Sequence, residues 1–202
     1  HLGREIQDRR VLEAMGRVPR EEFLPEASRH LAYEDIPLPI GEGQTISQPY
    51  IVALMTQALE LSGVEKVLEV GTGSGYQAAI LSLLASRVIT VERYRSLAER
   101  AQERLSRLGY KNIEVFLAGE ALGWKAEAPY DAIVVTAGAP KIPQELLNQL
   151  VVNGRLVIPV GTRYEQDLVK VTRLSDGLSI GNLGACRFVP LIGDTAWREE
   201  EL

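Results

Sequence analysis

Residues 66–79 read KVLEVGTGSGYQAA, and this stretch decides the fold class. Its first part, residues 66–70, is a short run rich in β-branched residues, which is typical of a buried strand, and it leads directly into Gly71, Gly73 and Gly75. Glycine lets a backbone turn tightly and approach a ligand closely, and a helix that starts directly afterwards presents free N–H groups. The stretch therefore predicts a strand, a ligand-binding turn and a helix.

The glycine spacing distinguishes between kinds of nucleotide-binding loop. The dinucleotide fingerprint G-x-G-x-x-G requires glycine at the position of Tyr76, and the G-K-[ST] ending of a P-loop is missing. Glu92 ends the next predicted strand, where a carboxylate is placed to bind a ribose diol. Glu69 is an acid inside a predicted buried strand, and a cationic ligand would give a reason for it. The alternative without a ligand is a tight strand–helix turn followed by an exposed acid.

The rest of the chain alternates strands and helices around this unit. Alternation with short connections predicts right-handed βαβ units, and therefore an α/β fold with a mostly parallel, doubly wound sheet and helices on both faces. The tail has hairpin-like spacing, which predicts an antiparallel edge at the C-terminal end. The predicted helices cover residues 4–16, 50–61, 75–85, 95–108 and 143–150, and the predicted strands cover 66–70, 87–92, 113–117, 131–136, 155–160, 167–174, 178–180 and 186–191.

We expect a single domain over residues 1–202, because this length allows one sizeable core. Within it we expect N-terminal helices and a substrate loop in residues 1–62, a cofactor-binding core in 63–161 and C-terminal strands in 162–202. Residues 31–49 are rich in proline and glycine, so they are expected to form an extended loop.

Composition argues against several classes of function. The net charge of −5 disfavours nucleic acid as a partner, and no apolar run approaches the roughly 18 residues that span a bilayer. The charged N-terminus carries no export signal and the single Cys186 fits a reducing compartment, so we expect a cytoplasmic protein, monomeric and without a membrane partner. Two histidines, His1 and His30, leave no zinc cluster and little basis for a Ser-His-Asp hydrolase, and no metal site is expected.

The loop in its full form, E-x-G-x-G-x-G, looks like the cofactor loop of the class I S-adenosylmethionine-dependent methyltransferases. This resemblance implies a Rossmann-like fold, S-adenosyl-L-methionine as the cofactor and S-adenosyl-L-homocysteine as the product. It places the first acid near the amino-acid portion of the cofactor and the later acid on the ribose. The implied cofactor-binding residues are Glu69, Gly71, Thr72, Gly73, Ser74, Gly75 and Glu92, with Gly119 and Glu120 near the adenine.

A second stretch makes the resemblance more specific. Residues 32–55, AYEDIPLPIGEGQTISQPYIVALM, together with LEVGTGSGYQAA, APYDAIVVTAGAP, GRLVIPVG and FVPLIG, resemble the protein-L-isoaspartate O-methyltransferase family over residues 9–193. That family methylates the α-carboxylate of L-isoaspartyl residues in damaged proteins and peptides, and its active-site serine corresponds to Ser47. The implied substrate-binding residues are Thr45, Ile46, Ser47 and Gln48.

The residues suit this reaction on their own terms. A carboxylate acceptor is already ionised at neutral pH, so the transfer needs positioning rather than a strong base. Hydroxyl groups of Thr45 and Ser47 are suitable donors to such a carboxylate. Residues 134–140, VVTAGAP, lack the [ND]-P-P-[YF] motif of amino-methylating relatives. Ser47 also precedes a helix that starts near Pro49, so it has an alternative role as the N-cap, and the two roles can coexist.

Residues 117–124, LAGEALGW, depart from the family pattern G-D-G, whose aspartate binds the adenine amino group. Gly119 takes the place of this aspartate, and we expect Glu120 to assume its role, with backbone groups alone as the alternative. Trp124 is either a stacking surface for adenine or a packing residue. Asp131 is either a cofactor contact or a solvated acid at a strand end. Residues 188–191, FVPL, are expected in the core at the sheet edge, with lining of the peptide groove as a second possibility.

Three other functions stay open. One is a class I methyltransferase for another carboxylate or small molecule, which the TISQP stretch disfavours. A second is a catalytically silent cofactor-binding or interaction module, which the two intact loops disfavour. The third is a nicotinamide-dependent dehydrogenase, which Tyr76 in place of the fingerprint glycine disfavours.

Overall fold

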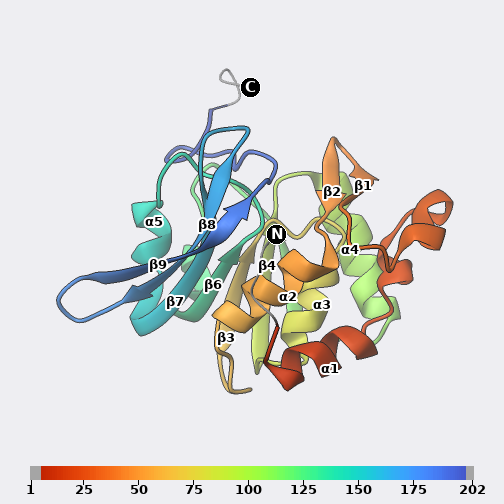
Figure 1. Cartoon of the computed structure of the whole chain (residues 1–202), viewed down its shortest axis with the longest axis horizontal. Helices are drawn as coiled ribbons and strands as arrows, with labels where there is room; N and C mark the ends of the chain where they lie inside the picture. Colours follow the sequence, from red (N-terminus) through yellow and green to blue (C-terminus); the bar gives the residue numbers. More distant parts are fainter. Residues whose placement is uncertain (1–5, 199–202) are drawn as a thin grey trace.

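A seven-stranded sheet forms the centre of the protein in the computed structural model, which describes residues 6–198 (Figure 1). The strand order is β5-β4-β3-β6-β7-β8-β9, with the first five strands parallel and the last two antiparallel. The strands are β3 (Lys66–Val70), β4 (Arg87–Glu92), β5 (Ile113–Leu117), β6 (Tyr130–Val135), β7 (Leu150–Gly161), β8 (Gln166–Arg173) and β9 (Leu178–Cys186). The predicted α/β fold with an antiparallel C-terminal edge is confirmed.

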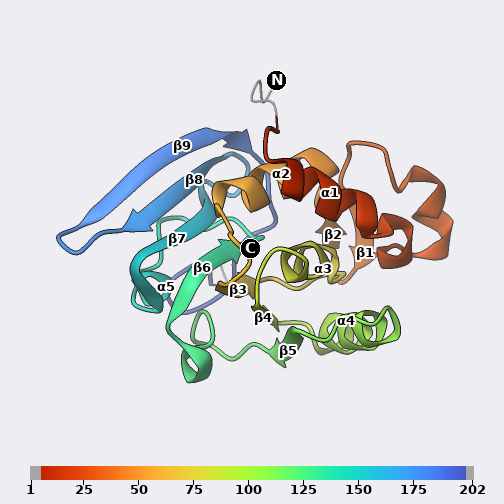
Figure 2. The same ribbon diagram turned by 90° about the horizontal axis from the view of Figure 1, so that it is seen from below.

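Helices cover both faces of this sheet (Figure 2). They are α1 (Arg9–Arg17), α2 (Pro49–Ala58), α3 (Tyr76–Ser82), α4 (Arg95–Arg107) and α5 (Gln144–Leu147), with short 3-10 helices η1 (Arg20–Phe23), η2 (Glu26–Leu31) and η3 (Lys125–Glu127). One face packs on α1 to α4 and the other on α5 and the C-terminal segment, which gives two hydrophobic clusters. None of the helices in the described part of the chain has the length and apolar character that crossing a bilayer requires.

The central strands read as near-continuous apolar runs because both of their faces are covered. In β3, Val67 belongs to the cluster under α1 to α4, whereas Leu68 belongs to the cluster on the other face. Glu69 follows on the same face as Val67, opposite Thr90 of the neighbouring strand. An acid and a hydroxyl thus lie side by side on this face, next to the apolar Val67 and Val88.

The N-terminal part differs from the predicted pattern in two places. The helix expected over residues 4–16 begins at Arg9, because the side chain of Asp8 accepts a hydrogen bond from Arg10 N and caps it there; residues 4 and 5 of this expectation lie outside the described residues. The region expected to be an extended loop contains an antiparallel hairpin of β1 (Leu38–Gly41) and β2 (Gln44–Ile46). Gly41 and Gly43 have φ of 98° and 67°, which makes this tight turn possible.

The C-terminal part also differs from the prediction. The helix expected over 143–150 covers only Gln144–Leu147, because Leu150 already pairs with Tyr130 in the sheet. The two strands expected at 178–180 and 186–191 are replaced by the single strand β9. Residues 187–191 leave the sheet instead, and Val189 O accepts a hydrogen bond from Gly138 N at 2.8 Å. The segment thereby crosses the end of the sheet, and this is where the site lies.

Candidate active site

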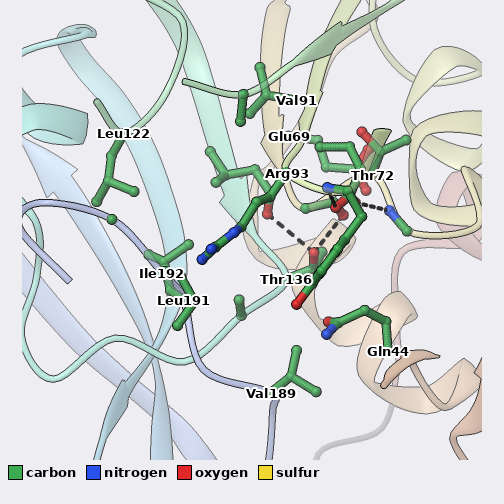
Figure 3. Close-up of a pocket in the computed structure, with 18 of the residues that line it drawn as sticks. Gln44, Glu69, Thr72, Val91, Arg93, Leu122, Thr136, Val189, Leu191 and Ile192 are labelled. Carbon is green, nitrogen blue, oxygen red and sulfur yellow. Dashed lines mark hydrogen bonds between the residues drawn. The ribbon is translucent and has the colours of Figure 1, made fainter. Parts of the chain in front are cut away.

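A cavity of about 910 Å³ opens at the carboxyl ends of β3, β4 and β6, where open parallel sheets generally bind ligands (Figure 3). Its polar wall consists of the ends of these strands and the loop between β3 and α3. The opposite walls come from the β1–β2 hairpin on one side and from residues 189–198 on the other. The cavity therefore joins segments that are far apart in the sequence, from the β1–β2 hairpin to residues 189–198.

Gly71 brings the backbone of the loop across the strand ends. Its φ is 102°, and a Cβ atom there would lie 2.3 Å from Thr136 Oγ1. Both the backbone conformation and the lack of space therefore disfavour any side chain at this position. Thr136 Oγ1 donates a hydrogen bond to Gly71 O at 2.7 Å, and Gly71 N donates to Val91 O at 2.9 Å (Figure 3). These bonds hold the loop between β4 and β6. Thr72, Gly73 and Ser74, which are expected to bind the cofactor, line the cavity directly after it.

Gly75 has a different position from the other loop glycines. It caps α3 with φ of 88° but lies outside the cavity lining. A Cβ atom at this residue would approach Leu105 Cγ and Cδ1 of α4 to 3.3 Å. Its position therefore favours close packing of the loop on α4 over the predicted contact with a cofactor.

Glu92 is held at the cavity by two backbone N–H groups. Its Oε2 accepts from Gly73 N at 2.8 Å and its Oε1 accepts from Tyr94 N at 3.0 Å. Each carboxylate oxygen has two acceptor positions, so both can accept a further hydrogen bond. The carboxylate is only 6% exposed and already oriented, which suits the binding of a ribose diol.

Glu69 is fully buried at the end of β3, on the same wall as Thr72 (Figure 3). Its Oε2 accepts from Thr90 Oγ1 at 2.6 Å, and the Thr90 and Thr72 hydroxyls are 2.7 Å apart. Its Oε1 has no partner within the described residues, and burial raises the pKa of the carboxyl to about 8. A cationic group in the cavity would both satisfy this oxygen and favour the ionised carboxylate. The acid thus suits an ammonium group, such as the one on the methionine portion of the expected cofactor.

The predicted substrate loop lies on the neighbouring wall. Thr45, Ile46 and Ser47 line the cavity, whereas Gln48 lies outside it. Gln48 is itself the N-cap residue of α2, so the alternative that Ser47 caps this helix is wrong. Ser47 therefore stands at the cavity without a capping role.

Asp35 supplies the cap that was the alternative role for Ser47. Its Oδ1 accepts from Tyr50 N, in the first turn of α2, at 2.8 Å, and its Oδ2 accepts from Gln48 Nε2 at 3.3 Å. One carboxylate thus ties the start of the helix to the end of the loop that bears Ser47. Sequence reasoning missed this residue, because it comes well before the helix that it caps.

At the far end of the cavity, Gly119 and Glu120, which are expected near the adenine, line the wall beside the buried Leu122. Trp124 lies outside the lining and stacks on Phe116, with ring centroids 4.5 Å apart, so of its two alternatives the packing role is the observed one. Asp131 accepts from Lys66 N at 2.8 Å. Because Lys66 begins β3, this contact is at the opposite end of the strands, and a cofactor contact for Asp131 is wrong.

The wall formed by residues 189–198 was only partly predicted. Val189 and Leu191 line the cavity, which supports the second possibility given for this segment. Ile192 and Arg93 were missed, and in Figure 3 the Arg93 side chain extends across the opening toward Ile192. The only local signal for Arg93 is that it follows Glu92 at a strand end. No local pattern distinguishes the residues after 191.

The comparisons with known proteins agree with this geometry. A family model described as protein-L-isoaspartate(D-aspartate) O-methyltransferase matches residues 2–196. A protein-L-isoaspartate O-methyltransferase from Geobacter metallireducens is 58% identical over 201 residues, which are 99% of this chain and 93% of the relative. Protein-L-isoaspartate O-methyltransferase 1 from Syntrophobacter fumaroxidans is 60% identical over 196 residues, which are 97% of this chain and 92% of the relative.

Solved structures show the same relationship. A structure named protein-L-isoaspartate O-methyltransferase has a TM-score of 0.85 at 30% identity and covers 95% of this chain, which in turn spans 63% of that longer chain. A proposed protein-L-isoaspartate O-methyltransferase from Plasmodium falciparum, in complex with S-adenosyl-L-homocysteine, has a TM-score of 0.79 at 28% identity. The match covers 94% of this chain and 93% of that one.

Proposed function

The chain belongs to the protein-L-isoaspartate O-methyltransferase family, and we propose that it transfers a methyl group from S-adenosyl-L-methionine to the α-carboxylate of L-isoaspartyl residues in damaged proteins and peptides. The observation that carries this proposal is one cavity with two kinds of polar wall. The ends of β3 and β4 offer the buried acids Glu69 and Glu92 to a cationic cofactor, whereas the hairpin and the residue directly after it offer the hydroxyl groups of Thr45 and Ser47 to an anionic acceptor. Methyl transfer from a cationic cofactor to an anionic acceptor is favoured when acids face the cofactor and hydroxyl donors face the acceptor.

The acids and the backbone hold the cofactor in this proposal. Glu69 accepts from the ammonium of the methionine portion, and Glu92 accepts from the ribose hydroxyls. Gly71 and Gly73 let the backbone lie close beneath the ligand. Glu120, on the wall near Leu122, accepts from the adenine amino group. When bound, S-adenosyl-L-methionine supplies a methyl group on a sulfonium, which is a good leaving group for displacement.

Ser47 and Thr45 hold the acceptor carboxylate. Their hydroxyl groups donate to one carboxylate oxygen and leave the other free to attack the methyl carbon, which yields a methyl ester and S-adenosyl-L-homocysteine. Positioning supplies the rate enhancement, because the acceptor is already ionised and no proton has to be removed from it. A hydroxyl donor suits this task better than an acid or a cation, since it neither repels nor neutralises the nucleophile.

The test is methyl transfer from labelled S-adenosyl-L-methionine to two synthetic peptides that differ only in L-isoaspartate against L-aspartate. We expect base-labile labelling of the isoaspartyl peptide alone. Labelling of neither peptide, while the cofactor binds, would show that this acceptor is wrong and that another carboxylate or small molecule is the substrate.

Ser47→Ala tests the role of the hydroxyl. We expect kcat/KM for the isoaspartyl peptide to fall by at least about tenfold, the loss expected for a hydrogen bond to a charged group, while S-adenosyl-L-homocysteine binds as before. Ser179→Ala is the matched control, since Ser179 is exposed on β9 and outside the cavity lining. Equal activity of the two variants would show that the Ser47 hydroxyl takes no part in the reaction.

We also propose that the enzyme acts in the cytoplasm and as a monomer. The single Cys186 supports a reducing compartment. The residues proposed to hold the cofactor and the acceptor carboxylate line one cavity within a single chain, which supports a reaction by the monomer.

A further inference from the structure

Two side-chain oxygens on the cavity wall are buried without a hydrogen-bond partner in the described part of the chain. They are Glu69 Oε1 and Gln77 Oε1. A buried acceptor without a donor costs free energy, so such atoms call for an explanation. Both atoms are acceptors and both residues border the same cavity, which points to a ligand that brings N–H or O–H donors.

Gln77 lies in the first turn of α3, directly after the glycine loop, and is 6% exposed. Its Nε2 donates to Thr56 Oγ1 at 2.8 Å, while Thr56 Oγ1 donates to Val52 O at 2.7 Å. Because the only hydroxyl proton of Thr56 is used on Val52, Thr56 must accept from the amide. The unpartnered atom of Gln77 is therefore its oxygen, not its nitrogen.

Glu69 is also held by a hydrogen bond to a buried threonine. Thr90 occupies one oxygen of the carboxyl group and leaves the other without a partner, as Thr56 occupies the nitrogen of Gln77 and leaves its oxygen. In both cases a buried threonine fixes the side chain, and one oxygen remains free to accept a hydrogen bond from a ligand. The two acceptors come from β3 and α3, the elements on either side of the glycine loop.

We propose that Gln77 is a further cofactor-binding residue, whose Oε1 accepts a hydrogen bond from the α-ammonium of the methionine portion beside Glu69, with Thr56 as its positioning residue. This inference rests on the proposed function. An ammonium has three donors, so it can satisfy both oxygens, and its charge compensates the buried carboxylate. The substrate carboxylate is excluded from this place, because it brings no donor and would meet acceptors of like polarity.

The experiment compares two ligands on the wild-type protein and on Gln77→Met, which keeps the length of the side chain and removes the amide. S-Adenosyl-L-homocysteine carries the amino-acid portion, whereas 5′-methylthioadenosine has the adenosine without it. We expect Gln77→Met to raise the Kd of S-adenosyl-L-homocysteine by about 10- to 100-fold in calorimetry, the loss expected for a hydrogen bond to a charged group. The Kd of 5′-methylthioadenosine should stay the same.

Thr56→Val tests the positioning role. It removes the partner of Nε2, so the affinity for S-adenosyl-L-homocysteine should fall in the same ligand-selective way but less, and Thr56→Ser should restore it. Gln102→Met, on the exposed side of α4, is the control for the glutamine substitution and should leave both Kd values unchanged. Thermal unfolding of each variant shows whether the fold is kept.

Three results would overturn the inference. An equal loss of affinity for both ligands would mean that Gln77 only shapes the cavity. Unchanged affinity for S-adenosyl-L-homocysteine, with a higher KM for the isoaspartyl peptide, would assign Gln77 to the substrate. If the wild-type protein did not bind S-adenosyl-L-homocysteine at all, the proposed function would fail and this inference with it.

Discussion

The two polar walls of the cavity are built in opposite ways. The cofactor wall comes mainly from one continuous stretch, residues 66–94, whose strands lie side by side in parallel register, and residues 118–123 complete it at its exposed end. The substrate wall joins the β1–β2 hairpin to residues 189–198, which are distant in the sequence and lie outside the main sheet, apart from isolated bridges. One wall is thus part of the sheet itself, and the other is attached to it.

This difference shows in how the functional groups are held. On the cofactor wall, Glu92 and the glycine loop are hydrogen-bonded to neighbouring backbone, and Glu69 is enclosed by the sheet. On the substrate wall, the loop around Ser47 depends on the contacts of Asp35, and residues 189–191 depend on Gly138. We therefore expect changes in the first wall to affect folding and cofactor binding together. Changes in the second wall should affect peptide handling and, to a smaller extent, stability, but not cofactor binding.

The largest effect is expected for Gly71→Ala. The new Cβ would clash with Thr136 and the residue would keep a positive φ, so cofactor affinity should fall by more than about 100-fold and stability by about 2 kcal/mol or more. Gly43→Ala is the matched change in the other wall, with φ of 67° but nothing within 4 Å of the new Cβ. It should cost only about 1 kcal/mol and leave the affinity for S-adenosyl-L-homocysteine unchanged. Calorimetry measures the cofactor affinity and urea unfolding measures the stability. Similar losses of both quantities in the two variants would contradict the proposed difference between the walls.

The next effect concerns the pH dependence of the unliganded protein. The native pKa of Glu69 is raised from 4.5 to about 8, so between these values the native state binds more protons than the unfolded state. The free energy of unfolding should therefore fall as pH rises through this window, by an amount of the order of a few kcal/mol. Glu69→Gln removes the titrating group, so its stability should vary less with pH over the same range.

Urea unfolding at a series of pH values measures this effect. Parallel profiles for the wild type and Glu69→Gln would show that the carboxyl does not titrate in this window. Binding of a cationic cofactor should also release a proton from Glu69 near neutral pH. Calorimetry in two buffers of different ionisation enthalpy would detect the release.

A smaller effect is expected for Asp35→Ala, in the substrate wall. Loss of the cap on α2 should lower stability by about 1 kcal/mol and raise KM for the isoaspartyl peptide several-fold, with cofactor affinity unchanged. Asp8→Ala is the matched control, because Asp8 caps α1 by the same kind of contact, 2.9 Å from Arg10 N, and lies outside the cavity lining. It should lower stability to a similar extent without changing KM. A weaker affinity for S-adenosyl-L-homocysteine in Asp35→Ala would show that the two walls are coupled.

The smallest effect is expected for Glu120→Gln, at the exposed end of the cofactor wall. If the carboxylate accepts from the adenine amino group, its loss should raise the Kd of S-adenosyl-L-homocysteine about three- to tenfold, because solvent competes at an exposed site. Glu103→Gln, on the exposed face of α4, serves as the control. An unchanged Kd would mean that backbone groups alone hold the adenine.

The sequence by itself determined the central strands and the polar groups at their ends. β3, β4 and β5 begin and end at the predicted residues, and Glu69, Gly71 and Glu92 all lie at the cavity. These features are local, because a strand covered on both faces needs a short apolar run and a tight turn needs glycine at a positive φ. Family resemblance, rather than local pattern, directed attention to Ser47, which local pattern also allowed as a helix cap.

Only the tertiary structure decided the rest. Residues 187–191 carry the β-branched and aromatic residues of a strand, yet they leave the sheet, and Val189 and Leu191 bond to Gly138, which follows β6. Trp124 packs on Phe116, Asp35 caps a helix that starts well after it, and Gln77 presents its oxygen because Thr56 holds its nitrogen. Each of these outcomes depends on a contact with a residue from another element. A local pattern encodes how a segment folds, but which groups are left to meet a ligand is settled only when distant segments pack together.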